Sequence, residues 1–216
     1  MVKMTQFKSR EEWLSARTSF IGGSEAACIV GQNPYMTNVE LWEIKTGRRQ
    51  REDISGKSYV EYGTKAEEHL RELFRLDFPD LKVDYTEHNM WTNDRFPFAH
   101  ASLDGWLTDQ DGRKGILEIK TTNILQSIQK EKWDHRIPSN YYVQCLHYLM
   151  VTEFDFVILK AQLKYDYGGD IFLNTKHYTI ERSEVEEDID YLREKEERFC
   201  ECIRKDIRPA LVLPDI

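Results

Sequence analysis

The sequence lacks long apolar runs, internal repeats and linker-like segments. Although 40 % of its 216 residues are apolar, no stretch approaches the ~18 apolar residues that a membrane-spanning helix needs. Residues 1–17 mix acidic and basic side chains and have no apolar core of a secretory signal. With no Pro/Ser-rich boundary, we expect one domain over 1–216, located in the cytoplasm and without a membrane partner.

Cysteine is scarce, and its spacing does not match a metal knuckle. The four cysteines are scattered, and the one close pair has a single intervening residue: Cys28, Cys145, Cys200 and Cys202. We therefore expect reduced thiols. Four cysteines nevertheless leave open an iron–sulfur cluster.

An excess of positive charge is also missing, since the formal net charge is −8. Nucleic-acid binding usually depends on clustered Lys and Arg. However, residues 181–202 contain ten acidic and four basic side chains, which account for six of the eight net negative charges. We expect an acidic helix at 183–206 with a charged face in solvent and an apolar stripe of Val185, Ile189, Leu192 and Phe199. The net charge therefore does not exclude DNA binding elsewhere.

Capping residues and turn signals predict an α/β fold with a mixed sheet flanked by helices. Ser9, Ser24 and Thr37 resemble helix starts, so the segment 9–50 should be helical and pack on the core. Further helices are predicted over Ser58–Asp77 and from Ser139 to about Val151, the latter apolar on nearly every side. The expected strands are Lys82–Tyr85, Ala101–Leu107, Ile116–Thr121, 154–163 and 171–180, the second and third pairing around the turn Asp111-Gly112.

The residues that suggest chemistry lie on this predicted hairpin. Side chains alternate across a strand, so Glu118 and Lys120 share one face, which we expect to be polar. Asp104 on the neighbouring strand would complete a set of two carboxylates and one amine. Such a set can bind a hard divalent cation and leave Lys120 beside a bound water, as phosphodiester hydrolysis requires. Taken alone, Glu118 and Lys120 also fit an ordinary surface charge pair.

A third carboxylate is predicted to point inward from the helix Ser58–Asp77. At 100° per residue Glu67 falls on the apolar stripe, whereas Glu68 turns toward Arg71 and other charged residues on the wetter side. Because an inward carboxylate is costly unless a cation or hydrogen bonds meet it, Glu67 is either a third metal ligand or the partner of an Arg or Lys.

Two further groups of polar residues could support such a site. Gln144 and Tyr148 lie one helical turn apart and can present their polar tips together, or be a buried amide and phenol satisfied locally. Arg17 with Ser24 at a helix start could hold a terminal phosphate, although alone they describe only a capped helix.

Together these residues resemble the YqaJ-type viral recombinase family, a lambda-exonuclease-like branch of the PD-(D/E)XK nucleases, over roughly Trp13–Lys164. The resemblance rests on Arg17 with 21–27, Gly63 with Glu67, Ala101-Ser102-Leu103-Asp104-Gly105, Glu118-Ile119-Lys120-Thr121, and Tyr142-Val143-Gln144 through Tyr148. It implies a PD-(D/E)XK core and an exonuclease that degrades one strand of linear duplex DNA from its 5′ end. The 3′ overhangs would serve a single-strand annealing partner, and some members form a ring-shaped trimer.

The resemblance also implies a role for each matching residue. Asp104, Glu118 and the Ile119 carbonyl would bind metal with help from Glu67, while Lys120 would orient or activate water. The metal would be Mg²⁺, two ions in all, with Mn²⁺ as a substitute. Gln144 and Tyr148 would support the site, and Arg17, Ser24 and Ser102 would lie near the 5′ phosphate. Leu103 and Glu68 depart from the family pattern at positions that supply no ligand.

Two other functions fit the same sequence. One is a different PD-(D/E)XK nuclease, either the Cas4-like type or an endonuclease. The other is a noncatalytic module that binds DNA ends or a partner protein, which the intact set of Asp104, Glu118 and Lys120 disfavours.

Overall fold

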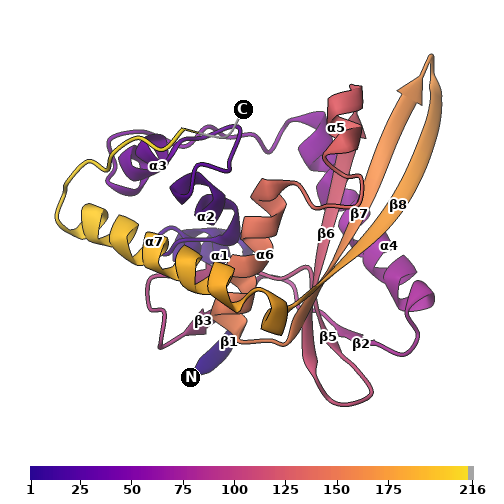
Figure 1. Cartoon of the computed structure of the whole chain (residues 1–216), viewed down its shortest axis with the longest axis horizontal. Coiled ribbons are helices and arrows are strands. Elements are labelled where there is room, and N and C mark those ends of the chain that lie inside the picture. Colours follow the sequence, from indigo (N-terminus) through magenta and orange to yellow (C-terminus); the bar gives the residue numbers. More distant parts are fainter. Residues whose placement is uncertain (214–216) are drawn as a thin grey trace.

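A five-stranded mixed sheet forms the centre of the molecule (Figure 1). The computed structural model describes residues 1–213, so the last three residues of the predicted 1–216 domain lie outside the description. The strand order is β2 (Lys82–Asp84), β5 (Gly105–Thr108), β6 (Lys114–Ile124), β7 (Phe156–Tyr167) and β8 (Asp170–Glu181). Only β6 and β7 are parallel. The predicted α/β class and the β5–β6 hairpin are confirmed.

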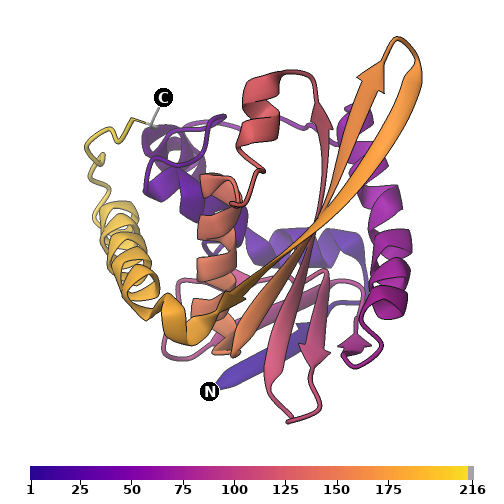
Figure 2. The same ribbon diagram turned by 45° about the vertical axis from the view of Figure 1, so that its right-hand side comes forward.

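Helix α6 (Ser139–Thr152) covers one face of this sheet. Parallel strands need a crossover connection, and α5 (Ser127–Glu131) and α6 make it between β6 and β7. On its other side α6 contacts α2 (Gly23–Ile29) and α7 (Glu186–Arg204), as the two views show (Figure 2). Every residue from Val143 to Thr152 is buried, which explains why this helix is apolar on nearly every side.

Helix α4 (Ser58–Asp77) covers the opposite face of the sheet. Leu70 and Phe74 on α4 pack with Leu117 and Ile119 of β6. Both faces of β6 are therefore covered, and Glu118 is only 1 % exposed. Glu118 and Lys120 share one face of β6 as predicted, but the crossover helix buries Glu118 on that face.

A second, three-stranded sheet was only partly predicted. It contains β1 (Val2–Gln6), β3 (Asn89–Asn93) and β4 (His100–Ala101). The predicted strand Ala101–Leu107 is in fact broken between β4 and β5. The side chain of Asn89 causes the break, because it donates to the Leu103 carbonyl and accepts from the Leu103 amide, both at 2.9 Å. This break places Asp104 just before β5.

The N-terminal helices begin as predicted in two of three cases. The Ser9 hydroxyl caps α1 (Arg10–Arg17), and Thr37 with Glu40 forms a capping box at α3 (Asn38–Lys45). The second helix begins after Gly22 rather than at Ser24, because the Glu25 carboxylate accepts from the Gly22 amide at 3.1 Å. Within residues 1–213, none of the helices combines the length and apolar character that crossing a bilayer demands.

The acidic helix α7 has the predicted apolar stripe, with Ile189, Leu192 and Phe199 buried. One of its acidic residues departs from the expected solvated face: Glu196 is fully buried, and its Oε1 lies 2.7 Å from His147 Nδ1.

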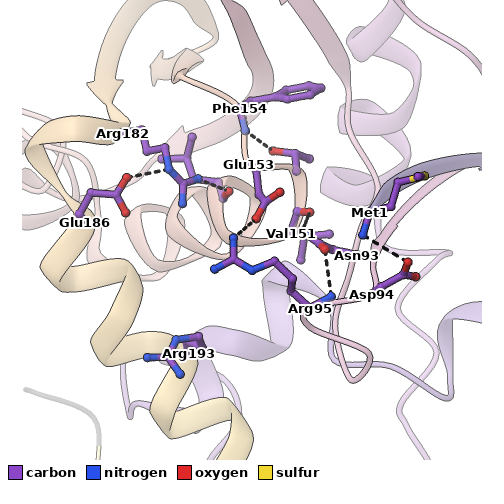
Figure 3. A network of polar contacts seen from close by, with 12 residues as sticks. Met1, Asn93, Asp94, Arg95, Val151, Glu153, Phe154, Arg182, Glu186 and Arg193 are labelled. Atoms are coloured by element: carbon purple, nitrogen blue, oxygen red, sulfur yellow. Dashed lines mark hydrogen bonds and ion pairs between the residues drawn. The ribbon is translucent and has the colours of Figure 1, made fainter.

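Polar contacts hold the C-terminal end of α6 in place (Figure 3). Arg182, in the short 3-10 helix Arg182–Glu184 before α7, donates to the Leu149 carbonyl at 2.6 Å and to Glu186 at 2.7 Å. From the second sheet, Asn93 donates to the Val151 carbonyl at 3.2 Å. Because α6 is anchored on two sides, the positions of Gln144 and Tyr148 over the sheet are fixed.

Candidate active site

Asp104, Glu118 and Lys120 lie together where β5 begins beside β6. Lys120 Nζ is 2.5 Å from Glu118 Oε1. Asp104 precedes β5, and its Oδ2 accepts from the Ile119 amide at 2.8 Å. Asp104 is partly exposed, and the Lys120 side chain is 21 % exposed. The structure thus brings the predicted trio into one partly open cluster.

The cluster contains more carboxylates than basic groups, so its carboxylates destabilise one another when they are charged. Burial, followed by Glu118 and Glu67, raises the pKa of Asp104 well above its usual value. Burial also raises the pKa of Glu118, against the opposing effect of Lys120. Burial alone would lower the pKa of Lys120, but Glu118 and Asp104 together raise it above its ordinary value. Lys120 is therefore protonated in this arrangement.

Glu118 has one satisfied oxygen and one that is not. Gln144 Nε2 donates to Glu118 Oε1 at 2.9 Å and to the Tyr148 hydroxyl at 2.8 Å, so the two polar tips do meet, as their spacing predicted. Glu118 Oε2 is buried and has no hydrogen-bond partner within residues 1–213. Such an orphaned oxygen is costly and suits a cation that the chain itself does not provide.

Glu67 lies near both carboxylates and also has the Arg partner that the sequence left open. Its Oε1 accepts from Arg71 at 2.7 Å, and its charge raises the pKa of Asp104 and Glu118. Glu68 is exposed, as predicted. Arg71, expected on the wetter side, is instead 4 % exposed, because it also donates to the Asp104 carbonyl at 2.6 Å.

The backbone of Ile119 turns toward Asp104. Strand β5 pairs with β6 only as far as Leu117, and beyond that point the Ile119 amide donates to Asp104. Within a strand the N–H and C=O of one residue point to the same side. The Ile119 carbonyl therefore also points to this side, past the last rung of the β5–β6 ladder.

These donors fit a hard divalent cation, which takes carboxylate and carbonyl oxygens. Glu67, Asp104 and Glu118 do not converge into a ready-made three-ligand set within residues 1–213. Each carboxylate has a partner from the chain, namely Arg71, the Ile119 amide and Lys120. The orphaned Glu118 Oε2 and the raised carboxyl pKa values are the features that a cation would relieve.

The residues expected near a 5′ phosphate lie on the neighbouring N-terminal segment. Arg17 Nε donates to His100 Nε2 at 3.1 Å, and the Arg17 guanidinium stacks over Trp13, 4.1 Å from its ring centre. Ser24 is exposed near the start of α2. The Ser102 hydroxyl is buried, with no hydrogen-bond partner in the described part of the chain.

Gly23 connects this segment to the cluster around Glu118. A Cβ at Gly23 would lie 2.6 Å from the Tyr148 ring and 2.9 Å from the Gln144 side chain, so only glycine lets α2 approach so closely. Tyr148 also raises the pKa of Arg17 against the larger lowering effect of burial. A path of contacts thus runs from Gly23 on α2 through Tyr148 and Gln144 to Glu118.

Sequence reasoning missed two residues that position this site. Arg71 holds both Glu67 and the Asp104 backbone; its i,i+4 spacing from Glu67 was the available signal. His100 accepts from Arg17, and burial, then Arg17, lowers the pKa of His100 to about 2, so its ring is neutral. No local pattern indicated His100, because its partner is 83 residues away.

The cysteines do not form a metal site. All four are free thiols: Cys28, Cys200 and Cys202 pack around one apolar cluster, and Cys145 belongs to another. Across residues 1–213, no three Cys, His or acidic side chains are arranged to hold a metal ion. The geometry therefore does not support the iron–sulfur alternative.

Two solved structures share the fold. The crystal structure of an alkaline exonuclease, LHK-Exo, from Laribacter hongkongensis aligns with a TM-score of 0.60 at 16 % identity, covering 91 % of this chain and 93 % of that one. A phage related exonuclease from Haemophilus somnus 129PT aligns with a TM-score of 0.52 at 12 % identity, covering 94 % and 91 %. At these identities the likeness shows the fold, which confirms the expected PD-(D/E)XK-type architecture.

Sequence comparison agrees with the predicted family. The chain is 33 % identical over 165 residues to the uncharacterized protein YqaJ of Bacillus subtilis (strain 168), an alignment that covers 76 % of this chain and 49 % of that protein. The chain thus spans about half the length of this relative. Residues 12–155, which include every residue of the cluster, match the family model of the YqaJ-like viral recombinase domain. The chain belongs to the YqaJ-like viral recombinase domain family.

Proposed function

We propose that this chain is a Mg²⁺-dependent exonuclease that degrades one strand of linear double-stranded DNA from its 5′ end. The observation that supports this most is the buried Glu118, with an orphaned oxygen, beside Asp104 and 2.5 Å from Lys120. The two structural neighbours are both named as exonucleases, and the family is one of viral recombinase domains. Phosphodiester hydrolysis is the chemistry that suits these three groups.

In this proposal Asp104, Glu118 and the Ile119 carbonyl hold the metal, with Glu67 assisting. When bound, the metal (two Mg²⁺ ions, with Mn²⁺ as substitute) would supply charge neutralisation at the phosphate and would lower the pKa of the attacking water. Gln144 keeps Glu118 in place through its 2.9 Å hydrogen bond. Arg71 does the same for Asp104 by holding its carbonyl.

Lys120 acts as a charged donor rather than as a base. Its pKa is raised by Glu118 and Asp104, so it retains its proton at neutral pH. A protonated amine at this position orients the attacking water by hydrogen bonding and stabilises charge that develops on the phosphate.

Arg17, Ser24, Ser102 and Tyr148 form the proposed binding region for the 5′ end of the DNA. The neutral His100 orients the Arg17 guanidinium, and an oriented guanidinium suits a terminal phosphate. The Ser102 hydroxyl, two residues beyond His100, is buried without a hydrogen-bond partner in residues 1–213 and offers a further donor. Holding the end beside Tyr148 and Gln144 would place the adjacent phosphodiester near Glu118, which gives the reaction its 5′→3′ polarity.

The remaining elements of the proposal concern the protein's partners. Degradation of one strand leaves 3′ overhangs, which suit a single-strand annealing protein. A homotrimeric ring around the DNA would allow processive degradation with few basic residues, in keeping with the net charge of −8.

A gel assay on end-labelled DNA tests the proposal. We expect 5′-phosphorylated linear duplex to be degraded with Mg²⁺ and spared with EDTA, while covalently closed circles persist. Equal cutting of circles would indicate an endonuclease. Tight binding of DNA ends without cleavage, in Mg²⁺ or Mn²⁺, would indicate the noncatalytic module instead.

A further inference from the structure

The outer edge of β8 is long, apolar and open. β8 is the last strand of its sheet, and all twelve of its residues pair with β7. Ile171, Phe172 and Leu173 are each 54–55 % exposed, and the β7–β8 hairpin projects beyond the body of the molecule (Figure 2). An exposed apolar edge is a template for another strand, and proteins usually protect such edges with charge, proline or a covering segment.

A groove of about 770 Å³ continues along the same edge. Residues 176–180 of β8 line one side, and residues 135–137 with Tyr142 line the other. Neighbouring side chains of a strand point to opposite faces. Residues 176–180 are consecutive, so they can all line one groove only where the groove runs along the edge of the strand. Backbone N–H and C=O groups of β8 therefore border the groove.

The lining of this groove is basic, although the chain as a whole is acidic. Arg136 and Lys176 contribute the two positive charges, and none of the lining residues is Asp or Glu. Arg136 is exposed and makes a 3.4 Å contact with the Glu131 carbonyl. Lys176 is shared between the Trp133 carbonyl at 2.8 Å and the exposed Asp134 at 3.4 Å. This lining favours an occupant that bears carboxylates.

We propose that an extended acidic peptide of a partner protein adds to the β8 edge as a sixth strand. Its backbone pairs with β8, its apolar side chains cover Ile171–Leu173, and its carboxylates lie against Arg136 and Lys176. A strand edge recognises a peptide backbone, which a nucleic acid does not have. This interaction goes beyond the proposed nuclease function and does not depend on it.

Fluorescence anisotropy in EDTA tests the proposal with defined probes. The probe is a labelled peptide of alternating Glu and Val, as long as β8. We expect saturable binding that Arg136→Glu weakens by about tenfold or more. Lys132→Glu, an exposed charge reversal of the same segment outside the groove, should leave binding unchanged. A peptide of the same sequence with alternate backbone amides methylated should not bind, and circular dichroism should show both variants folded.

Four results would overturn the proposal. In the first two, the acidic peptide does not bind, or its methylated form binds equally well. In the third, oligothymidine binds preferentially and Arg136→Glu abolishes that binding. In the fourth, the chain self-associates in sedimentation and Phe172→Asp abolishes the self-association. The last two would assign the edge to nucleic acid or to a second copy of the chain. Arg136→Glu should retain wild-type cleavage of linear DNA, so this test and the nuclease test fail independently.

Discussion

Two buried glutamates, Glu118 and Glu196, have nearly the same bonding but different surroundings. Each is at most 1 % exposed, each has one oxygen paired with a basic side chain, and each has a second oxygen without a partner in residues 1–213. Glu196 pairs with His147, and both side chains are fully enclosed. Glu118 lies beside two more carboxylates and a partly exposed Lys120. An orphaned carboxylate oxygen thus suggests a metal site only where more oxygen donors and access from solvent accompany it.

Neutralising each glutamate should give the largest contrast. Glu118→Gln should lower the exonuclease rate by about 10³-fold or more, because it removes a metal ligand and several kcal/mol of transition-state stabilisation. Glu196→Gln should leave the rate within about threefold of wild type, a difference well under 1 kcal/mol. Single-turnover cleavage of labelled linear duplex measures both. Equal loss in the two variants would mean that Glu118 is structural.

Replacing Lys120 should separate catalysis from binding. Lys120→Ala should lower turnover by about 10²–10³-fold, the range for loss of one positioned hydrogen-bond donor, while DNA binding in EDTA stays near that of wild type. Parallel cleavage and anisotropy measurements test this prediction. Near-normal turnover would reject the proposed role of Lys120.

Glu196, which we expect to matter little for the cleavage rate, should matter for stability. Glu196→Ala leaves His147 without its buried partner and should lower the free energy of unfolding by about 3 kcal/mol. Glu197→Ala, at a partly exposed neighbouring position, should cost under about 0.5 kcal/mol. Urea unfolding in EDTA measures both. A small loss for Glu196→Ala would contradict a structural role of the enclosed pair.

Metal affinity should distinguish two adjacent glutamates of α4. Glu67→Gln should weaken Mg²⁺ binding by less than Glu118→Gln does, since Glu67 assists and is shared with Arg71. Glu68→Gln, its exposed neighbour, should bind Mg²⁺ as the wild type does. Titration calorimetry provides the affinities. Equal affinities in the Glu67 and Glu68 variants would remove Glu67 from the proposed ligand set.

In metal-free protein, the carboxylates around Asp104 and the buried pair of His147 and Glu196 should make the free energy of unfolding depend on pH over different ranges. Burial, then Glu118 and Glu67, raises the folded-state pKa of Asp104 above 3.8, so stability falls as pH rises from about 4. Asp104→Asn should reduce that fall and leave the part that comes from the raised pKa of Glu118. Burial lowers the pKa of His147, but the Glu196 carboxylate outweighs this effect and raises that pKa above 6.5. The stabilisation from that pair is complete below pH 6.5 and is lost as pH rises through the raised pKa, which Glu196→Gln should abolish. Urea unfolding at several pH values in EDTA tests both.

The sequence predicted what depends on local periodicity. Strand alternation identified Glu118 with Lys120, helical spacing identified Glu67 and the pair Gln144 and Tyr148, and capping residues located α1 and α3. Apolar patterns likewise predicted α4, α6 and the long strands of the main sheet.

Long-range contacts determine what sequence reasoning missed. The break before Asp104 depends on the side chain of Asn89, fourteen residues from Leu103. Arg17 meets His100 across 83 residues, and Glu196 meets His147 across 49. Strands β1 and β3 are short and carry polar residues, so only their pairing with each other and with β4 reveals them.

Crystals soaked with Mn²⁺ would test the central claim most directly. We predict an anomalous difference peak at about 2 Å from oxygens of Asp104 and Glu118, with the Lys120 ammonium displaced from Glu118 and no peak at Glu196. A map with no peak at Asp104 and Glu118, while the soaked protein still degrades linear DNA, would contradict the account.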